Sequence, residues 1–417
     1  MIVTRLRLAN LRAIEAAEFR FQPGFNLIVG VNGVGKTSVL DALGVCLAAV
    51  TRAVNQLRFR AESFSVEDIR IGAEALTAEC EVRLDGGDYA YLLHKPRYRS
   101  SPQAKGAGMP RAQVHATPEK AEFLGPAPAA VSGREAGGRP LAVLFSTNRS
   151  VPSDRAPGRN VAAGGIAAAF GDAFANRELR LGEFAAWLRV QDALRKERPA
   201  SARALRVMQD TIAEFLPGYR NLRPSKDKVT SLWIDRGPVS IPVRQLSDGE
   251  RGTLAVVLDL TRRLTQANPG LANPVTDAAA VVLIDEIDLH LHPKWQRQVV
   301  HNLTAAFPQC QFIATTHSPQ VIGEVEHDHI QIMSNGRVYS PTHSYGVDSS
   351  RVLEEVMDSA PRAKEVSAVL TNISRAIGRQ KFEDARELLA RLVAVLGESD
   401  PEVTRTRTLL DFVEGKE

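Results

Sequence analysis

The chain has 417 residues, 44% of them hydrophobic, and a formal net charge of +4. This length allows a sizeable core divided over two or three structural units, and the small charge permits contact with nucleic acid without requiring it. Cys46, Cys80 and Cys310 lie far apart without metal-ligand spacing, which argues against a disulfide framework and indicates a reducing compartment. The N-terminus lacks the apolar core of a signal peptide, and no apolar run approaches the roughly 18 residues that span a bilayer. We therefore expect a cytoplasmic protein without a membrane partner.

Residues 1–95 are predicted to form an ordered lobe. The segments IVTRLRLANLRAI and EFRFQPGFNLIVG indicate strands separated by turn residues. After GVNGVGKTS, apolar side chains repeat at helical spacing from Val39 to Val54, so a helix is expected there. The segment ALTAECEVRLDGGDYAYLLH is typical of a β-hairpin that turns around residues 85–87.

The segment GVNGVGKT, residues 30–37, matches the phosphate-loop pattern G-x-x-x-x-G-K-[ST] between a predicted strand and a predicted helix. Its glycines allow backbone amides to wrap around phosphates, and the positive end of the following helix faces the same anion. Lys36 is expected to reach the β- and γ-phosphates of ATP, and Thr37 is expected to ligate Mg²⁺. The predicted nucleotide-binding residues of this lobe are Gly30, Asn32, Gly33, Gly35, Lys36, Thr37 and Ser38, together with Arg12.

The composition changes after residue 95. Residues 96–140 are rich in Pro, Gly, Ala and Ser with almost no apolar periodicity, and we expect a flexible insertion here. From Lys95 to Arg159 the chain holds eleven basic residues against four acidic ones, a charge that can attract nucleic acid but more often marks a solvated surface. Residues 141–230 are predicted to contain a buried strand in PLAVLFSTNRS and two helical stretches, within 166–216, that are separated at Pro199.

Residues 231–345 are predicted to form a second lobe, which opens with a hairpin in SLWIDRGPVSIPV and continues into RQLSDGERG. Ser247 and Glu250 have the S-x-x-E spacing of a capping box, and apolar residues repeat at helical spacing behind them. A helix that starts at Ser247 offers free amides, a hydroxyl and a positive dipole end, which together can bind an anion. We therefore predict that Ser247, Gly249 and Glu250 contact nucleotide.

Two further strands are predicted to end in polar residues. The segment VVLIDEID indicates a buried strand followed by Asp285, which would hold the Mg²⁺ hydration shell, and Glu286, which would orient and deprotonate the attacking water. The segment FIATTHSPQ indicates a neighbouring parallel strand that ends at His317, which would donate to the γ-phosphate. Lys36, Glu286 and His317 are therefore the predicted catalytic residues, and Thr37 and Asp285 the predicted metal ligands.

Together these motifs resemble the ATP-binding-cassette (ABC) class of P-loop ATPases, in which LSDGER corresponds to the signature motif. In that class the signature of one protomer contacts the γ-phosphate held by the phosphate loop of the other, so the resemblance implies a head-to-tail homodimer at minimum. The long separation of Lys36 from Leu246 is similar to the SMC, RecF and OLD branch, whose two lobes are split by an insertion. The implied fold is α/β: a mixed sheet flanked by helices, an antiparallel β subdomain, a helical insertion and an all-α C-terminal tail.

Two positions depart from that class. His292 stands where many relatives have the aspartate of the D-loop, and STNR, ending at Arg149, occupies the position of the Q-loop glutamine. The roles in Mg²⁺ binding and lobe coupling at the second position are therefore open. His290 and His292 could suggest a metal site, but they lack carboxylate or cysteine partners at ligand spacing.

Residues 346–417 are predicted to form a helical tail that docks on the ABC domain or on another chain, because its helices are too few for a free-standing repeat array. The layout of the whole chain resembles the PtuA family of ATPases from Septu-type and retron-associated anti-phage systems, most clearly at LIDEIDLHLHPKWQ and SYGVDSSRVLEEVM. This resemblance implies a higher homo-oligomer and a PtuB-like HNH nuclease partner that the ATPase controls.

Two alternatives stay open. A DNA-repair ATPase of RecF or SMC type would bind DNA directly and with a steep salt dependence, whereas a nuclease controller would form a stable complex with its partner. A non-hydrolysing scaffold would use ATP as a structural ligand, although the intact Glu286 argues against this reading.

Overall fold

The computed structural model of the chain describes residues 1–57, 63–84, 87–97, 120–128, 138–150, 165–175, 178–225, 231–355, 357 and 362–415. These residues form two compact units, Met1–Ser349 and Ser350–Glu417, each with its own hydrophobic core. Most of the predicted flexible insertion, at 98–119 and 129–137, lies outside the described residues.

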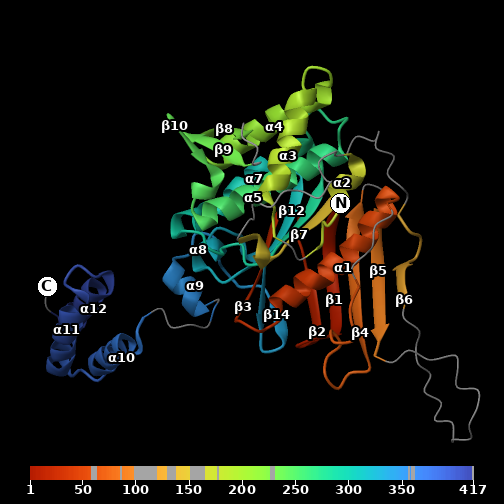
Figure 1. The fold of residues 1–417 in the computed structure, drawn as a ribbon. Coiled ribbons are helices and arrows are strands. Elements are labelled where there is room, and N and C mark those ends of the chain that lie inside the picture. Colours follow the sequence, from red (N-terminus) through yellow and green to blue (C-terminus); the bar gives the residue numbers. More distant parts are fainter. Residues whose placement is uncertain are drawn as a thin grey trace, which may run out of the picture. The chain divides into compact units, whose positions relative to one another are not determined.

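Three sheets organise the described part of the first unit (Figure 1). An antiparallel sheet has the order β2-β1-β4-β5-β6, and a smaller antiparallel sheet has the order β10-β9-β8. The third sheet has the order β14-β13-β3-β12-β11-β7, in which all neighbours are parallel except β13 and β14. The strands are β1 (Ile2–Leu11), β2 (Ile14–Arg20), β3 (Phe25–Gly30), β4 (Ala75–Leu84), β5 (Gly87–Pro96), β6 (Lys120–Leu124), β7 (Leu141–Phe145), β8 (Tyr219–Pro224), β9 (Leu232–Arg236), β10 (Val239–Pro242), β11 (Ala280–Ile284), β12 (Cys310–Thr316), β13 (Ile330–Ser334) and β14 (Arg337–Tyr339).

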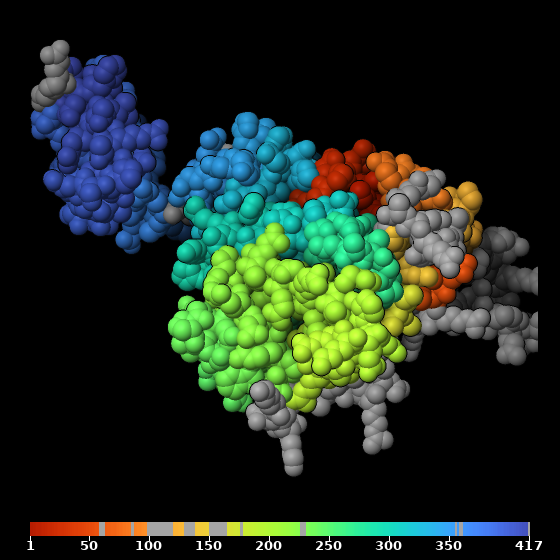
Figure 2. All heavy atoms as spheres, turned by 90° about the horizontal axis from the view of Figure 1, so that it is seen from above, coloured from red at the N-terminus to blue at the C-terminus, as the bar shows by residue number. Residues whose placement is uncertain are grey.

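Helices cover both large sheets. One helix, α1, packs between them, while α2, α3 and α4 form a helical insertion that packs on α5. In Figure 2 the yellow-green residues of this insertion gather on one face of the first unit. The helices of this unit are α1 (Lys36–Asn55), α2 (Ile166–Phe170), α3 (Leu181–Leu194), α4 (Pro199–Phe215), α5 (Asp248–Ala267), α6 (Pro274–Asp277), α7 (Pro293–Ala306) and α8 (Pro319–Ile322), with 3-10 turns η1 (Thr147–Ser150), η2 (Val243–Gln245) and η3 (His327–His329).

The helix after the phosphate loop, α1, is buried because a sheet packs on each side of it. Its predicted apolar positions are all buried, namely Val39, Leu40, Leu43, Cys46, Leu47, Val50 and Val54. Within the described part of the chain, α1 is the one helix long and apolar enough to cross a membrane by composition, but 72% of that apolar stretch is buried inside the fold. Its apolar character is therefore explained by its position in the core.

A single buried glutamine joins the two large sheets. Gln311 on β12 accepts a hydrogen bond from the Val3 amide at 2.7 Å and donates to the Val3 carbonyl at 2.8 Å. The same side-chain amide donates to the Gln22 carbonyl at 2.8 Å. Because buried polar groups must be paired, these bonds fix how β1 lies against the six-stranded sheet.

Most predicted elements are confirmed, including the hairpins β4–β5 and β9–β10 and the start of α4 at Pro199. Within the predicted flexible insertion at 96–140, the structure has β6, an exposed strand that pairs with β5 through its backbone and so needs no apolar pattern. The first predicted helical stretch is divided into α2 and α3. Cys46, Cys80 and Cys310 are buried free thiols, consistent with a chain that has no disulfide framework.

The second unit is helical, as the sequence predicts. Its core side chains come from three helices and include Ile373, Ile377, Ala385, Leu389, Leu392, Val403 and Leu410. An ion pair between Arg386 and Glu414 joins two of these helices. The helices are α9 (Ser349–Glu355), which spans the boundary between the units, α10 (Lys364–Gly378), α11 (Phe382–Leu396) and α12 (Pro401–Glu414).

Candidate functional site

Four strands of the six-stranded sheet end at the same edge, and polar residues follow each of them. β3 pairs with β12, β12 with β11 and β11 with β7, all in parallel, so their carboxyl ends lie side by side. The register aligns Ile284, the last residue of β11, with Phe145 at the end of β7. This edge therefore brings together the phosphate loop after β3, Asp285 and Glu286 after β11, His317 after β12, and η1 after β7.

The phosphate loop turns sharply between β3 and α1. Gly33 and Gly35 have φ values of 81° and 107°, which glycine adopts without steric cost. Gly30 is needed for space, because a Cβ atom there would lie 2.6 Å from the carbonyl oxygen of Met333 on β13. The glycines of the motif are therefore explained by the backbone path and by the neighbouring strand.

Lys36 opens α1 and is largely buried. Its ammonium group donates to the carbonyl oxygens of Gly30 at 2.8 Å and Val31 at 3.1 Å, which holds the side chain across the loop. Burial lowers the pKa of Lys36, and the carboxylates of the site partly offset this effect. Asn32 is exposed on the loop, while Ser38 is buried in the first turn of α1.

Thr37 and Asp285 form a pair of oxygen donors from different elements. The Thr37 hydroxyl donates to Asp285 Oδ2 at 3.0 Å. The other carboxylate oxygen, Oδ1, accepts from the Thr315 hydroxyl at 2.7 Å, so Asp285 is fixed between α1 and β12. Mg²⁺ prefers hard oxygen ligands and usually keeps several waters and phosphate oxygens in its coordination shell. The pair fits that ion.

Glu286 has an unusual backbone conformation. Its φ of 48° lies in the left-handed region, which is sterically disfavoured for residues other than glycine. The Glu286 amide donates to the Thr315 hydroxyl at 2.7 Å, and the next amide, of Ile287, donates to the Thr315 carbonyl at 2.9 Å. β12 therefore holds the main chain of the predicted catalytic glutamate in place.

His317 ends β12 beside the carboxylates. Burial lowers its pKa, and the Lys36 ammonium lowers it further, so the imidazole is neutral at pH 7. The His317 amide donates to Asp288 Oδ1 at 3.4 Å, and the Thr316 hydroxyl donates to the same oxygen at 2.6 Å. Asp288 thus ties the end of β12 to the loop after β11.

Arg12 reaches the site from the turn between β1 and β2. Its guanidinium donates to Asp41 at 2.6 Å and to Asp68 at 2.9 Å. A cavity of about 340 Å³ is lined by Arg12 and these two carboxylates together with Thr37 and Asp285. The structure therefore places Arg12 beside the predicted metal ligands, where its guanidinium forms ion pairs with Asp41 and Asp68.

The start of α5 carries the complete capping box that the sequence predicts. Ser247 Oγ accepts from the Glu250 amide at 3.3 Å, and the Glu250 carboxylate accepts from the Ser247 amide at 3.0 Å. Tyr219 on β8 donates to the other carboxylate oxygen of Glu250 at 2.9 Å. A Cβ atom at Gly249 would lie 2.5 Å from the His290 carbonyl oxygen, so the helix packs closely on the loop after β11.

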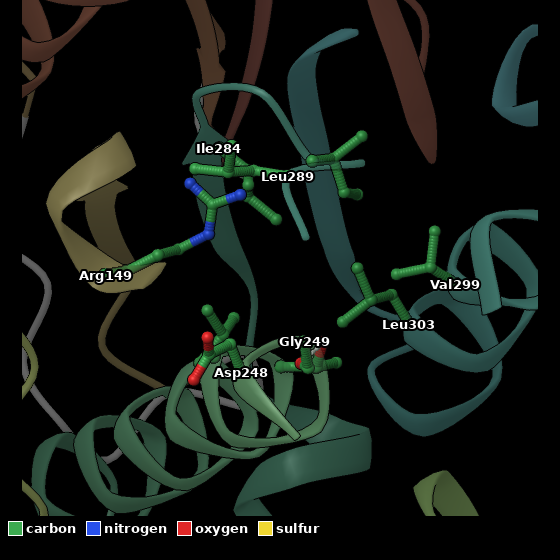
Figure 3. Close-up of a pocket in the computed structure, with 11 residues that line it drawn as sticks. Arg149, Asp248, Gly249, Ile284, Leu289, Val299 and Leu303 are labelled. Carbon is green, nitrogen blue, oxygen red and sulfur yellow. Dashed lines mark hydrogen bonds between the residues drawn. The ribbon is translucent and has the colours of Figure 1, made fainter. Parts of the chain in front are cut away.

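The start of α5 and Thr37, the last residue of the phosphate-loop motif, border different cavities. Asp248 and Gly249 line a cavity of about 30 Å³, with Arg149 on its opposite side (Figure 3). The cavity beside Thr37 is lined by residues between 12 and 175 and by Asp285. Within a single chain, the start of α5 and the Thr37–Asp285 pair thus border separate cavities.

The two positions that depart from the ABC pattern have structural roles of their own. His292 caps α7, since its Nδ1 accepts from the Lys294 amide at 3.3 Å. Among the described residues, no cluster of three or more His, Cys, Asp or Glu is suited to a metal ion. Arg149, in η1, is buried against the ends of β7 and β11.

Sequence reasoning missed three residues that position this site. Thr315 contacts both Asp285 and Glu286, and its signal was a threonine near the end of a predicted buried strand. Asp288 belongs to the same acidic segment as Asp285 and Glu286, yet its contact with the His317 segment depends on strand pairing. Tyr219 lies far away in the sequence and had no signal.

Comparison with known proteins relates the chain to ATPases. A family described as "AAA domain, putative AbiEii toxin, Type IV TA system" matches residues 148–323, and a second, described as "AAA domain", matches residues 5–117. The Retron Ec83 probable ATPase of Escherichia coli is 38% identical over 216 residues, which cover 51% of this chain and 40% of that protein. The Septu protein PtuA of Bacillus mycoides is 43% identical over 77 residues, which cover 18% of this chain and 10% of that protein. The matched regions thus span less than half the length of these relatives.

Among solved structures, an SMC head bound to the C-winged helix domain of ScpA aligns with 82% of this chain and 98% of its own. The sequence identity is 15% and the TM-score is 0.49.

The close approach at Gly249 can be tested by substitution. We expect Gly249→Ala to lower the free energy of unfolding by about 1–3 kcal/mol, because the methyl group would overlap the His290 carbonyl and force the helix or the loop to move. Urea denaturation measures the change. Gly270→Ala is the matched control, because a Cβ atom there meets nothing within 4 Å. Equal stability of the two variants would contradict the predicted contact.

Proposed function

We propose that this chain, which has the fold of an ABC-class ATPase and is related to retron and Septu ATPases, hydrolyses ATP between head-to-tail protomers and controls an HNH nuclease in anti-phage defence. The observation that carries the proposal is the convergence of the phosphate loop, Asp285, Glu286 and His317 at one edge of the parallel sheet. Three features of the chain would be involved: a site that hydrolyses ATP, a head-to-tail dimer that completes this site, and a surface that binds the nuclease.

The chemical step is supported by the arrangement of the described side chains. Phosphates would take the place of the carbonyl groups that Lys36 contacts, and the backbone amides of the loop would enclose them. Glu286 would orient a water and accept its proton, while neutral His317 would donate to the γ-phosphate. Mg²⁺, held by Thr37 and Asp285, would supply charge stabilisation at the phosphates.

The assembly is supported by the separation of the two half-sites. Ser247 and Gly249 begin a helix of 20 residues, whose N-terminal amides and dipole favour an anion. Because Thr37 and Asp285 of the same chain border another cavity, a second protomer is the natural source of that anion. A twofold arrangement of this kind closes two identical sites. Further copies would extend the dimer into a higher oligomer.

The partner is supported by an apolar strip on the second unit, formed by Leu409, Phe412 and Val413 on α12. Their spacing puts them on one helix face, and Phe412 is 82% exposed. Exposed apolar strips of this kind mark interaction surfaces. The resemblance of the sequence to PtuA-type ATPases implies a nuclease as that partner, and ATP occupancy would shift the assembly between states that hold or release it.

The catalytic role of Glu286 predicts a selective loss of turnover. We expect Glu286→Gln to lower kcat by roughly 10²–10⁴-fold because the amide cannot accept the proton of the attacking water. Affinity for ATP should change little, since the phosphate contacts remain. Steady-state phosphate release and nucleotide titration measure the two quantities, and the exposed Glu214→Gln provides a matched control. Equal rates in Glu286→Gln and the wild type would favour a non-hydrolysing scaffold.

The composite site predicts complementation between two inactive variants. Lys36→Ala removes the phosphate contact and Ser247→Arg blocks the signature, so each protein alone should lack turnover. In an equimolar mixture, half of the dimers would be mixed and each would contain one intact site, which gives about a quarter of wild-type activity. A mixture of folded, dimeric variants that stays inactive would contradict the head-to-tail site.

The partner can be tested with the full chain. We expect the chain to co-purify with an HNH nuclease encoded beside it, and Phe412→Glu to weaken that complex by at least tenfold because a charge replaces a buried aromatic contact. Thr404→Glu is the control, as it alters an exposed position of α12 outside the apolar strip. Direct duplex binding with a steep salt dependence, without a nuclease complex, would favour the DNA-repair alternative.

A further inference from the structure

A buried arginine at the position expected for a Q-loop glutamine contacts the main chain of the catalytic segment. Arg149 follows β7, within η1, and 6% of its surface is exposed. One guanidinium nitrogen donates to the Ser146 carbonyl at 3.0 Å and also to the Asp285 carbonyl. The other donates to the Glu286 carbonyl at 2.7 Å. Arg149 therefore holds two consecutive carbonyl groups where β11 ends.

The charge of this arginine is retained in spite of its burial. Burial lowers the pKa of Arg149 to about 10, and the carboxylates of Asp285, Asp288 and Glu286 act in the opposite direction. The guanidinium is thus protonated at neutral pH. A buried charge is costly unless it is well paired. The hydrogen bonds from the guanidinium to the carbonyl groups offset the cost of removing it from water.

The peptide groups on either side of Glu286 are held from two directions. Thr315 on β12 accepts the Glu286 amide at 2.7 Å, while Arg149 binds the Glu286 carbonyl from the β7 side. Between these two contacts the residue has its left-handed φ of 48°. A non-glycine residue keeps such a conformation when its surroundings fix it, and such residues concentrate at functional sites.

We infer that Arg149 is a positioning residue that fixes the main chain of Glu286 and thereby aims its carboxylate at the attacking water. The inference rests on the proposed hydrolytic role of Glu286. Figure 3 shows the guanidinium directed toward the end of β11 at Ile284, with the start of α5 at Asp248 and Gly249 across the cavity. The segment after β7 thus lies between α5, on which η1 packs, and the end of β11, which Arg149 holds through main-chain carbonyls rather than through an amide side chain.

The test separates positioning from folding and from nucleotide binding. We expect Arg149→Ala to lower kcat by about 10²-fold, because small displacements of a catalytic group have effects of that size, while Kd for ATP changes by less than about threefold. Arg149→Lys keeps the charge but presents one ammonium instead of a planar fork, so its kcat should be lowered almost as much as that of Arg149→Ala. Millimolar guanidinium chloride, far below denaturing concentrations, should restore part of the turnover of Arg149→Ala and none of that of Glu286→Gln.

Thermal denaturation and circular dichroism confirm folding, and Arg195→Ala, which removes an exposed ion pair with Asp192, is the matched control. If Arg149→Ala does not fold, Arg149→Lys carries the same test. Wild-type turnover in a folded Arg149 variant would overturn the inference, as would a rise in Kd that accounts for the whole loss, or an Arg149→Ala protein that guanidinium does not rescue. An inactive wild type would instead overturn the proposed hydrolysis, so the two failures are distinct.

Discussion

The parallel pairing of β11 with β7 and β12 is the constraint on which this site depends. Each strand ends at the same edge, so residues that follow different strands meet although they lie far apart in the sequence. Thr315 makes the pairing chemically specific, because its hydroxyl donates to the Asp285 carboxylate and accepts the Glu286 amide. A shift of one residue in this register would turn the side chains of β11 to the opposite face and break both contacts.

The geometry of the site is maintained against a local conformational preference. The left-handed backbone of Glu286 costs about 1–2 kcal/mol relative to a right-handed residue. The hydrogen bonds from its amide to Thr315 and from Arg149 to its carbonyl contribute about 0.5–1.5 kcal/mol each, which offsets that cost. Gln311, which ties β12 to β1 and to the Gln22 carbonyl, holds the second sheet against this strand. A strained but fully paired segment keeps one arrangement, as a preorganised catalytic group requires.

The signature helix shows how one helix start can combine a cap with a binding end. The capping box satisfies the amides of Ser247 and Glu250, and Tyr219 anchors the Glu250 carboxylate to β8. Other amides of the first turn have no partner within the helix, because the first four amides of a helix lack intrahelical acceptors. Gly249 allows this turn to pack closely on the His290 carbonyl, in the loop that follows Asp285 and Glu286. The start of α5 is thereby coupled to the Glu286 segment of its own chain. In the proposed dimer, its helix dipole would favour the phosphate bound by the other protomer.

The sequence by itself determined the elements and the chemistry of each motif. Periodicity located α1 and the buried strands, the capping box fixed the start of α5, and glycine spacing identified the phosphate loop. These features are local, and their physical causes act within a few residues. Tertiary structure decided which residues the motifs contact: Thr315 binds Asp285 and Glu286, and Arg149 binds the carbonyl groups of the same two residues. Such contacts join residues 29 or more positions apart, and their geometry follows from strand order and register, which local patterns do not encode.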